Sequence, residues 1–263
     1  MSSSPNSTKL QGKRAVVTAG AQGIGLATSR ALLESGSDGF VHYHSSSAGA
    51  EELAALAEQL GRRFGSVSAD LTQPEGGKQV IDAAVACLGG LDVLINNAGS
   101  LVARHSLDTI DEAFWAKVMA LNVDSLWRVS QAAQPHLIEA ATNRGGASIV
   151  NLASLAGRKG GHAGSLAYST SKGAVLTFTR SLASELGPKG VRVNALAPGL
   201  ILGTSFHNTH TTDESAKATI AGIPLGQAGT PDDVARAALF LASEYDGFIT
   251  GATLDVNGGV WAA

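Results

Sequence analysis

One tyrosine and one lysine stand a helical turn apart in the second half of the chain. Tyr168 and Lys172 belong to the segment Tyr-Ser-Thr-Ser-Lys, which opens a helical pattern and so places both side chains on the same face. A free phenol has a pKa of about 10, too high for easy proton exchange at neutral pH, but a neighbouring ammonium stabilises the phenolate and lowers this pKa. The spacing therefore predicts that Tyr168 acts as a general acid or base.

A serine at the end of an expected strand joins this pair. Ser154 follows the apolar run 148–152, so it lies at the edge of the sheet where a ligand of the first strand–helix unit would bind. A Tyr-x-x-x-Lys pair alone also occurs by chance on surface helices. Because Ser154 is expected at the same edge, the three side chains are predicted to converge on one reactive site.

A glycine-rich turn follows the first expected strand, and a helical pattern begins inside it. Glycines let the backbone close on a phosphate, and the helix N-terminus offers unpaired N–H groups with a partial positive charge. The turn therefore predicts a dinucleotide-binding loop. The residues expected to bind the phosphates are Gly20, Gln22, Gly23, Ile24 and Gly25.

The elements that must position these residues alternate between short strands and longer helices. Apolar, β-branched runs predict seven strands, at 15–19, 40–43, 65–69, 93–96, 148–152, 191–196 and 253–256. Apolar residues that recur at three and four predict helices at 24–34, 50–60, 78–88, 112–137, 167–186 and 232–243. This alternation predicts an α/β fold: a Rossmann-type, doubly wound, seven-stranded parallel sheet with helices on both faces.

The composition indicates a single domain. The 263 residues contain no Pro/Gly-rich linker, charge block or repeat, so residues 10–263 are expected to form one Rossmann-type catalytic domain. The Ser-rich segment 1–9 is expected to be a flexible tail. Residues 198–224 show no clear pattern, and a connection of that length in a compact domain predicts a substrate lid.

Charge and cysteine content narrow the class of partner. A net charge of -3 without any run of Lys and Arg argues against nucleic-acid binding. No apolar stretch approaches about 18 residues, so no membrane association is expected. Cys87 is the only cysteine, which excludes a multi-cysteine zinc site and agrees with a reducing compartment such as the cytoplasm. The sequence therefore predicts a small polar molecule as the partner, with no metal.

These segments together resemble the short-chain dehydrogenase/reductase family. The glycine-rich turn is similar to the family's T-G-x-x-x-G-x-G loop, although Ala19 replaces the first glycine. Asn-Asn-Ala-Gly at 96–99, Asn-Ala-Leu-Ala-Pro-Gly at 194–199 and the C-terminal motifs extend the resemblance from Leu10 to Gly259. It implies a catalytic tetrad formed by Asn122, Ser154, Tyr168 and Lys172.

The resemblance also implies a role for each member of the tetrad. Tyr168 protonates the alkoxide that develops during carbonyl reduction, and Ser154 donates a hydrogen bond to the same oxygen. Lys172 lowers the pKa of the phenol and holds the nicotinamide ribose, while Asn122 positions a water in a proton path. The implied reaction is hydride transfer between a nicotinamide coenzyme and a carbonyl or secondary alcohol.

The end of the second expected strand predicts the coenzyme preference. Enzymes that use NAD often carry an Asp or Glu about 20 residues beyond the glycines, and the segment 42–47 contains no carboxylate. The sequence therefore favours NADP(H) over NAD(H), with Tyr43, His44 and Ser45 near the 2′-phosphate. The resemblance adds further coenzyme contacts at Asp70, Leu71, Asn97, Ala98, Gly99, Pro198, Gly199, Ile201 and Thr204.

The loops around the expected cleft carry several potential cations: Arg104, His105, Arg158, Lys159, His162, His207 and His210. Such a cleft suits an anionic, hydroxyl-rich substrate such as a keto-uronate. Arg104, His162 and His207 are the predicted substrate residues. The segments 99–104 and 204–207 resemble those of reductases that act on 4-deoxy-L-erythro-5-hexoseulose uronate, the unsaturated-uronate product of alginate breakdown.

Other functions remain open at this point. A 3-oxoacyl thioester reductase, acting on an acyl carrier protein or CoA ester, is similar over the whole scaffold. A catalytically inactive dinucleotide-binding regulator would keep the glycine loop without needing the tetrad, and a Rossmann methyltransferase would have no reason to keep Tyr168 and Lys172 one turn apart. The resemblance also implies a homotetramer, with a homodimer as the alternative, through the long helices 112–137 and 167–186.

Overall fold

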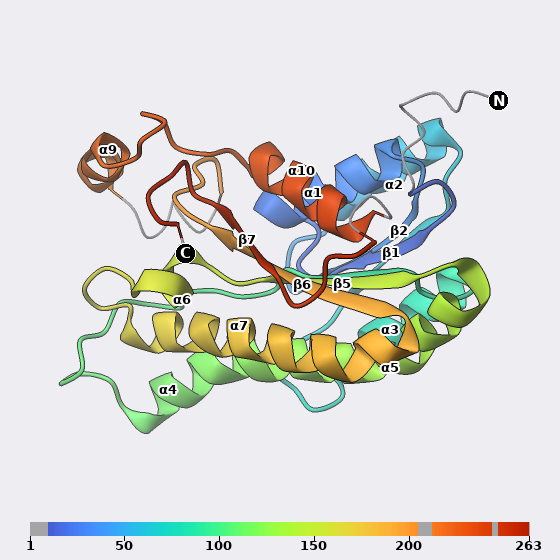
Figure 1. The fold of residues 1–263 in the computed structure, drawn as a ribbon, viewed down its shortest axis with the longest axis horizontal. Helices are drawn as coiled ribbons and strands as arrows, with labels where there is room; N and C mark the ends of the chain where they lie inside the picture. The colour runs from blue at the N-terminus through green and yellow to red at the C-terminus, as the bar shows by residue number, and fades with distance from the viewer. Residues whose placement is uncertain (1–9, 205–211, 244–246, 263) are drawn as a thin grey trace.

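Seven short runs, most of them buried, form the strands of one parallel sheet in the computed structural model, which describes residues 10–204, 212–243 and 247–262 (Figure 1). Seven strands were predicted, and all seven are confirmed. Their bounds are β1 (Arg14–Val17), β2 (Asp38–Tyr43), β3 (Phe64–Ser68), β4 (Val93–Asn96), β5 (Ala147–Leu152), β6 (Val191–Pro198) and β7 (Thr253–Val256).

The strand order places a crevice beside β1. The sheet runs β3-β2-β1-β4-β5-β6-β7, so β1 pairs with β2 on one side and with β4 on the other. Val16, for example, lies opposite Phe40 and Leu94. Because the strand order reverses between the parallel neighbours β1 and β4, the loops that leave their carboxyl ends diverge and open a space for a ligand.

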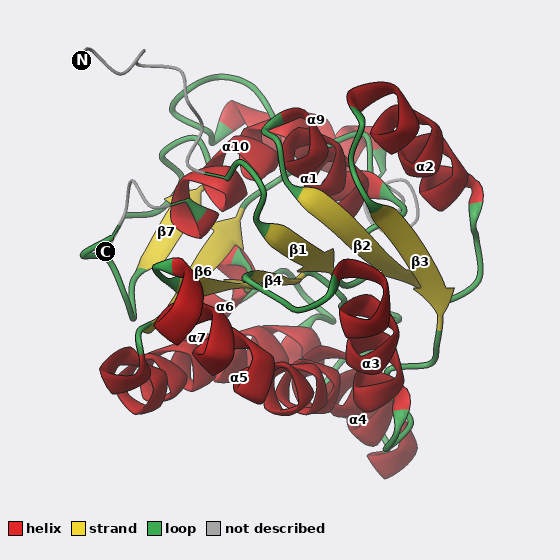
Figure 2. Ribbon diagram, turned by 90° about the vertical axis from the view of Figure 1, so that its right-hand side faces the viewer, coloured by secondary structure: helices red, strands yellow, loops and turns green. Residues whose placement is uncertain are grey.

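Helices cover both faces of the sheet, as a doubly wound fold requires (Figure 2). One face is packed by α1 (Gly23–Glu34), α2 (Ala48–Leu60) and α10 (Pro231–Ala242), and the other by α3 (Gly76–Leu88), α5 (Ser125–Arg144) and α7 (Leu166–Leu186). Each face has its own buried apolar cluster. The predicted single-domain α/β Rossmann fold is therefore confirmed.

The long helix predicted at 112–137 is interrupted and extended. It consists of α4 (Glu112–Met119), a π-helical turn (Ala120–Asp124) and α5, which continues to Arg144 despite Pro135. The Asn122 amide donates to the carbonyl of Val118, four residues earlier, and so competes with the backbone inside the widened turn. Such π turns are frequent at functional sites.

Two helices and one turn were not predicted. These are α6 (Leu155–Lys159), α9 (Asp213–Ala221) and a 3-10 turn (Gly187–Lys189). Because α6 has only five residues, it leaves no periodic apolar pattern. No residue of α9 is buried, so α9 also lacks an apolar stripe.

Some sequence predictions fall outside the described residues. These are the tail at 1–9 and the part of the lid at 205–211 that contains His207 and His210. The lid segment is otherwise visible as the loop 199–204 and as α9. None of the described helices combines the length and the apolar character that a membrane crossing demands.

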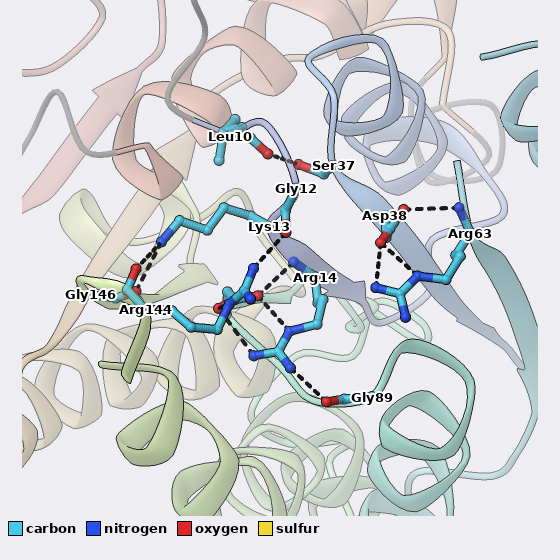
Figure 3. Close-up of polar contacts among 11 residues, drawn as sticks. Leu10, Gly12, Lys13, Arg14, Ser37, Asp38, Arg63, Gly89, Arg144 and Gly146 are labelled. Atoms are coloured by element: carbon cyan, nitrogen blue, oxygen red, sulfur yellow. Dashed lines mark hydrogen bonds and ion pairs between the residues drawn. The ribbon is translucent and has the colours of Figure 1, made fainter. Parts of the chain in front are cut away.

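Asp92 ties the amino ends of the central strands together through two arginines, Arg14 and Arg144, which are labelled in Figure 3. Asp92, whose side chain is fully buried, accepts hydrogen bonds from the side chains of Arg14 (2.7 Å) and Arg144 (3.0 Å). The same two guanidinium groups donate to the carbonyls of Gly89 and Gly12. These contacts close the amino-terminal edge of the sheet, opposite the edge where the crevice opens.

The Asp92→Asn variant is expected to lose about 3 kcal/mol of unfolding free energy, because it leaves the largely buried Arg14 without its counter-charge. Burial opposes ionisation of Asp92, but the hydrogen bonds and charges of Arg14 and Arg144 outweigh it and hold its pKa below the usual value. The Asp92 contribution is therefore present above about pH 4 and is lost as the pH falls below that. Urea unfolding at pH 7 and pH 3 measures both effects.

The matched control removes an exposed ion pair. Arg30 and Glu52 pair on the surface with both side chains over 40% exposed, so Glu52→Gln should cost less than about 1 kcal/mol. An equal loss in the two variants would contradict the structural role of Asp92.

Candidate active site

The three reactive side chains predicted from the sequence meet at the carboxyl ends of β5 and β6. Tyr168 and Lys172 lie in the first two turns of α7, and Ser154 caps the N-terminus of α6, where its Oγ accepts a hydrogen bond from the Ala156 N–H (3.1 Å). Ser154 also hydrogen-bonds the Tyr168 side chain. The Ser154 hydroxyl therefore faces Tyr168, and a substrate oxygen bound beside both hydroxyls would accept the hydrogen bond that Ser154 now makes with Tyr168.

Burial acts against the predicted acidity of Tyr168. It raises the pKa of the Tyr168 phenol above its ordinary value, although the hydrogen bond from Ser154 acts in the opposite direction. The Lys172 Nζ lies 5.9 Å from the centroid of the Tyr168 ring. The lowering of the Tyr168 pKa by this ammonium stays a prediction.

Lys172 is a buried ammonium with a backbone partner. Its side chain donates to the carbonyl of Leu152 (2.6 Å), and only 4% of the residue is exposed. Burial lowers the pKa of Lys172 to about 8, because desolvation penalises the charged form. Lys172 therefore changes its charge within the pH range in which enzymes are usually assayed.

Gly99 lies between the side chains of Asn122 and Lys172. The Oδ1 of Asn122 accepts from the Ser100 N–H (3.0 Å), and its Nδ2 donates to the carbonyls of Ser100 and Val118 (2.9 Å each). A Cβ on Gly99 would lie 2.7 Å from Asn122 Oδ1 and 3.0 Å from Lys172 Nζ, so only glycine fits between them. The Asn122 side chain thus holds the loop after β4, and its role with a water stays a prediction.

The glycine-rich turn is fixed from the loop after β4. Asn97 Nδ2 donates to the carbonyls of Thr18 and Ala19 (3.1 Å each), and Thr18 Oγ1 accepts from the N–H groups of Asn97 and Ala98. A Cβ on Gly25 would lie 2.2 Å from the Ala19 carbonyl oxygen, so this close packing requires glycine. Ala19 keeps a φ of +49°, in the left-handed region that glycine normally occupies.

The start of α1 fits a phosphate group. Gln22 precedes the helix in an extended conformation, its side chain does not cap the helix, and the first turn carries no acidic residue. The free N–H groups of this turn border the cavity at Gln22, Gly23 and Ile24. An uncapped N-terminus of this kind is suited to the pyrophosphate of a dinucleotide.

One cavity of about 490 Å³ joins the glycine-rich turn to the reactive side chains. Ser154, Tyr168 and Lys172 line it together with Arg104, Lys159 and His162. No Asp or Glu occurs among the described residues that line this cavity. The predicted coenzyme residues that line it are Gln22, Gly23, Ile24, Asn97, Gly99, Pro198, Gly199, Ile201 and Thr204.

Comparison with known proteins agrees with this site. The profile of the enoyl-(acyl carrier protein) reductase family matches residues 18–261. The 3-oxoacyl-[acyl-carrier-protein] reductase of Vibrio cholerae is 35% identical over 252 residues, which cover 96% of this chain and 98% of that protein. The chain belongs to the short-chain dehydrogenase/reductase family.

Solved structures of this family resemble the chain over nearly its whole length. The NADH-dependent reductase A1-R′, responsible for alginate metabolism, has a TM-score of 0.88 at 33% identity and covers 97% of this chain and 99% of its own. A short-chain dehydrogenase from Burkholderia cenocepacia, in complex with NADP, has a TM-score of 0.87 at 33% identity and covers 97% and 100%. The chain is therefore an oxidoreductase of this family with a nicotinamide dinucleotide coenzyme.

Several predicted coenzyme residues of this dehydrogenase/reductase lie at the same edge of the sheet without lining the cavity. Gly20 and Ala98 lie in the loops after β1 and β4, and Gly25 lies in the first turn of α1. Tyr43 ends β2, His44 and Ser45 follow it, and Asp70 and Leu71 follow β3. Asp70 accepts hydrogen bonds from the Thr72 side chain (2.7 Å) and N–H (2.9 Å), which lower its pKa and keep it ionised. Leu71 is buried.

Two of the predicted cations point elsewhere. Arg158 pairs with Asp255 (3.1 Å) and stacks over the ring of Trp261 (4.8 Å to its centroid), so it joins α6 to β7 and the C-terminal segment. His105 packs against Phe114, with 4.3 Å between ring centroids. Neither residue lines the cavity, and their prediction as substrate-facing cations is wrong.

Some residues at the site were not predicted. Ser215 and Thr219 reach the cavity from α9, which lies at the same end of the molecule as α6 (Figure 1). The signal for α9 was present in Thr-Asp-Glu-Ser, because Thr212 caps the helix by accepting from the Ser215 N–H (3.2 Å) and acidic residues fill the first turn. The capping pattern therefore carried information that the apolar pattern lacked.

The Ser154→Ala variant is expected to lower kcat of this dehydrogenase/reductase about 100-fold, because the oxygen of the substrate loses one donor. It also removes the cap of α6, at a cost of about 1 kcal/mol in unfolding free energy. Steady-state kinetics and thermal unfolding separate the two effects. Ser154→Thr keeps the hydroxyl and the cap and should retain most activity; equal losses in the Ala and Thr variants would contradict a role for the hydroxyl.

Proposed function

We propose that this chain uses NADP(H) to reduce the keto or aldehyde group of a polar, anionic sugar acid such as a keto-uronate. The observation that carries the proposal is the lining of the cavity. Arg104, Lys159 and His162 face the same space as Tyr168, and the described lining contains no carboxylate. Such a surface attracts an anion and offers donors to its carboxylate.

The chain's own side chains supply the proton and hold the oxygen. Tyr168, whose burial favours the protonated phenol, gives its phenolic proton to the oxygen of the substrate carbonyl, and the Ser154 hydroxyl donates a hydrogen bond to that same oxygen. The Lys172 ammonium would stabilise the phenolate that Tyr168 leaves behind and would hold the nicotinamide ribose of the bound coenzyme. The bound nicotinamide supplies the hydride.

The preference for NADP(H) rests on the residues that follow β2. His44 and Ser45 are exposed there, and no carboxylate is present in the segment 42–47 to repel a 2′-phosphate. We expect NADPH to bind more tightly than NADH in a fluorescence titration at equal ionic strength. Tighter binding of NADH would overturn this part of the proposal and would match the NADH dependence of A1-R′.

The lid and the assembly complete the proposal. The segment 198–224 is proposed to close over the substrate, since α9 contributes Ser215 and Thr219 to the cavity. The chain is proposed to form a homotetramer in the cytoplasm, with a homodimer as the alternative. Large apolar side chains remain exposed on the long helices, namely Trp115, Trp127 and Leu166. Light scattering of the purified protein measures the assembly.

A 3-oxoacyl thioester reductase is the second candidate, because relatives with that activity are 35% identical over nearly the whole chain. Its substrate joins a ketone to a carrier through a thioester. The cation-lined cavity gives no reason to prefer such a ketone over a sugar acid, since the reacting part of a 3-oxoacyl chain carries no charge.

The deciding experiment follows the oxidation of NADPH and of NADH in the presence of keto-uronates, sugar ketones, diketones and acetoacetyl thioesters. We expect the highest kcat/KM for a keto-uronate, and at least a tenfold lower value for the analogue without the carboxylate, because a charge-assisted hydrogen bond is lost. Highest activity on acetoacetyl thioesters would favour the second candidate. Coenzyme binding without oxidation on any substrate would indicate the inactive regulator.

The cations can be tested directly. Arg104→Gln is expected to lower kcat/KM for the keto-uronate about tenfold and to leave that for a neutral diketone within twofold. Lys117→Gln, at a cation on α4 that does not line the cavity, is the control. If Arg104→Gln lowers both values equally, Arg104 does not bind the carboxylate.

A further inference from the structure

A histidine at the end of β2 contacts the glycine-rich turn. His42 is only 3% exposed, and its Nδ1 accepts a hydrogen bond from the N–H of Ala19 (3.0 Å). The carbonyl of the same histidine accepts from the N–H of Gly20 (2.9 Å). On the far side of the ring, Nε2 lies 3.0 Å from the carbonyl oxygen of Ala69, which precedes Asp70. His42 thus joins the first turn of the coenzyme site to the end of β3.

These contacts select one state of the imidazole. A backbone N–H can only donate and a backbone carbonyl can only accept, so the ring must carry its proton on Nε2 and a lone pair on Nδ1. Burial lowers the pKa of His42, against the opposing effect of the Ala69 carbonyl, which agrees with a neutral ring. A doubly protonated ring would lose the contact with Ala19, because its Nδ1 could no longer accept.

The partner of Nδ1 is the residue at which this chain departs from the family pattern. Ala19 has a φ of +49°, a conformation that costs alanine more than glycine. Its peptide groups are held from two sides: the N–H by His42, and the carbonyl by Asn97 (3.1 Å). A left-handed non-glycine residue persists where its surroundings over-determine it. These two contacts provide that restraint.

The position of Ala19 affects the whole turn. Ala19 lines the cavity, and its carbonyl oxygen fits closely against Gly25 in the first turn of α1. The N–H groups of that turn are the ones expected to receive the pyrophosphate. A shift of Ala19 would therefore move the groups that bind the coenzyme.

We infer that His42 is a positioning residue for the coenzyme: as the neutral Nε2–H tautomer it holds Ala19 in the left-handed conformation and so keeps the phosphate-binding turn in place. His42 does not touch the coenzyme in this role. It acts through Ala19 and compensates for the alanine that stands where the family has glycine. The inference rests on the nicotinamide coenzyme of the family and not on the identity of the substrate.

The first test uses the unmodified protein without coenzyme. ¹⁵N NMR of histidine-labelled chain at pH 7.5 is expected to show, for His42, a protonated Nε2 and an unprotonated Nδ1. A His42 ring protonated on Nδ1 would overturn the inference. This measurement needs no variant to fold and no substrate to be known.

The second test uses two variants that each retain one side of the ring. Asn places its amide oxygen near the position of Nδ1, so His42→Asn keeps an acceptor for Ala19 and loses the contact with Ala69. Gln places its amide near Nε2, so His42→Gln keeps the contact with Ala69 and leaves the Ala19 N–H unpaired. We expect the Kd of NADPH, or of whichever coenzyme binds the unmodified chain, to rise about tenfold in the Gln variant and to stay within threefold in the Asn variant.

Ala19→Gly provides the rescue. Glycine adopts the left-handed conformation without help. In the Ala19→Gly background, the factor by which His42→Gln raises the Kd should therefore be at least three times smaller than in the unmodified chain. Equal Kd values for the Asn and Gln variants, or an unchanged penalty in the glycine background, would overturn the inference. Failure of the unmodified chain to bind either coenzyme would instead refute the coenzyme assignment, and the NMR result would still test the contact.

Discussion

The Tyr168→Phe variant is expected to lose about 1,000-fold in kcat for carbonyl reduction, while its Kd for the coenzyme changes less than twofold. Phe keeps the ring and its packing but removes the hydroxyl, which is the proton donor that the Ser154 hydrogen bond orients. General acid catalysis contributes about 10²–10⁴-fold in enzymes, so loss of the proton donor is expected to cost a factor within this range. Stopped-flow single-turnover kinetics with saturating NADPH measures the chemical step directly.

The control for this variant is a tyrosine away from the reacting atoms. Tyr43 ends β2, where the 2′-phosphate is predicted to bind, and does not line the cavity, so Tyr43→Phe should keep kcat within twofold when the coenzyme is saturating. A Tyr168→Phe variant that retains more than a tenth of the kcat would show that another group donates the proton. Equal unfolding free energies for the variant and the unmodified chain, within about 1 kcal/mol, would confirm that the loss is chemical.

The sequence was sufficient to predict most of the sheet, for a physical reason. Strands of a parallel sheet are buried on both faces, so they appear as short apolar runs bounded by turns. The strands at Val93–Asn96 and Thr253–Val256 were predicted to the residue. The meeting of Ser154 with Tyr168 followed from the same rule, because the carboxyl ends of parallel strands lie at one edge.

The sequence did not predict side-chain contacts or pKa values that depend on residues far away in the chain. Arg158 looked like a free cation in a polar loop, but its partner Asp255 lies 97 residues later in the chain. The raised pKa of Tyr168 also depends on burial by distant segments, which the Tyr-x-x-x-Lys spacing does not report. His42 was visible only as part of a polar strand end, and its contact with Ala19 required the parallel pairing of β1 and β2.

Lys172→Met is expected to lower kcat/KM for the coenzyme about 100-fold at pH 7, because the ammonium that stabilises the phenolate and the ribose is lost while the apolar stem is kept.

In the unmodified chain the pKa of Lys172 is lowered to about 8 by burial, so the charged form is lost as the pH rises through 8. The kcat/KM of the unmodified chain should therefore fall about tenfold per pH unit above 8, since kcat/KM reports the free enzyme. The Met variant should show no such fall in this range.

As kcat/KM falls above pH 8, the unfolding free energy should rise. This opposite change distinguishes titration of Lys172 from loss of activity through unfolding at high pH. The folded chain releases the Lys172 proton near pH 8, whereas the unfolded chain holds it until about pH 10.5, so the unfolded state binds more protons between these values. The unfolding free energy of the unmodified chain, relative to Lys172→Met, should consequently rise by up to about 3 kcal/mol from pH 8 to 10.5. Falling kcat/KM together with rising relative stability has one common cause, the discharge of a buried ammonium. A break at pH 8 in the activity of the Met variant would assign the titration to another group.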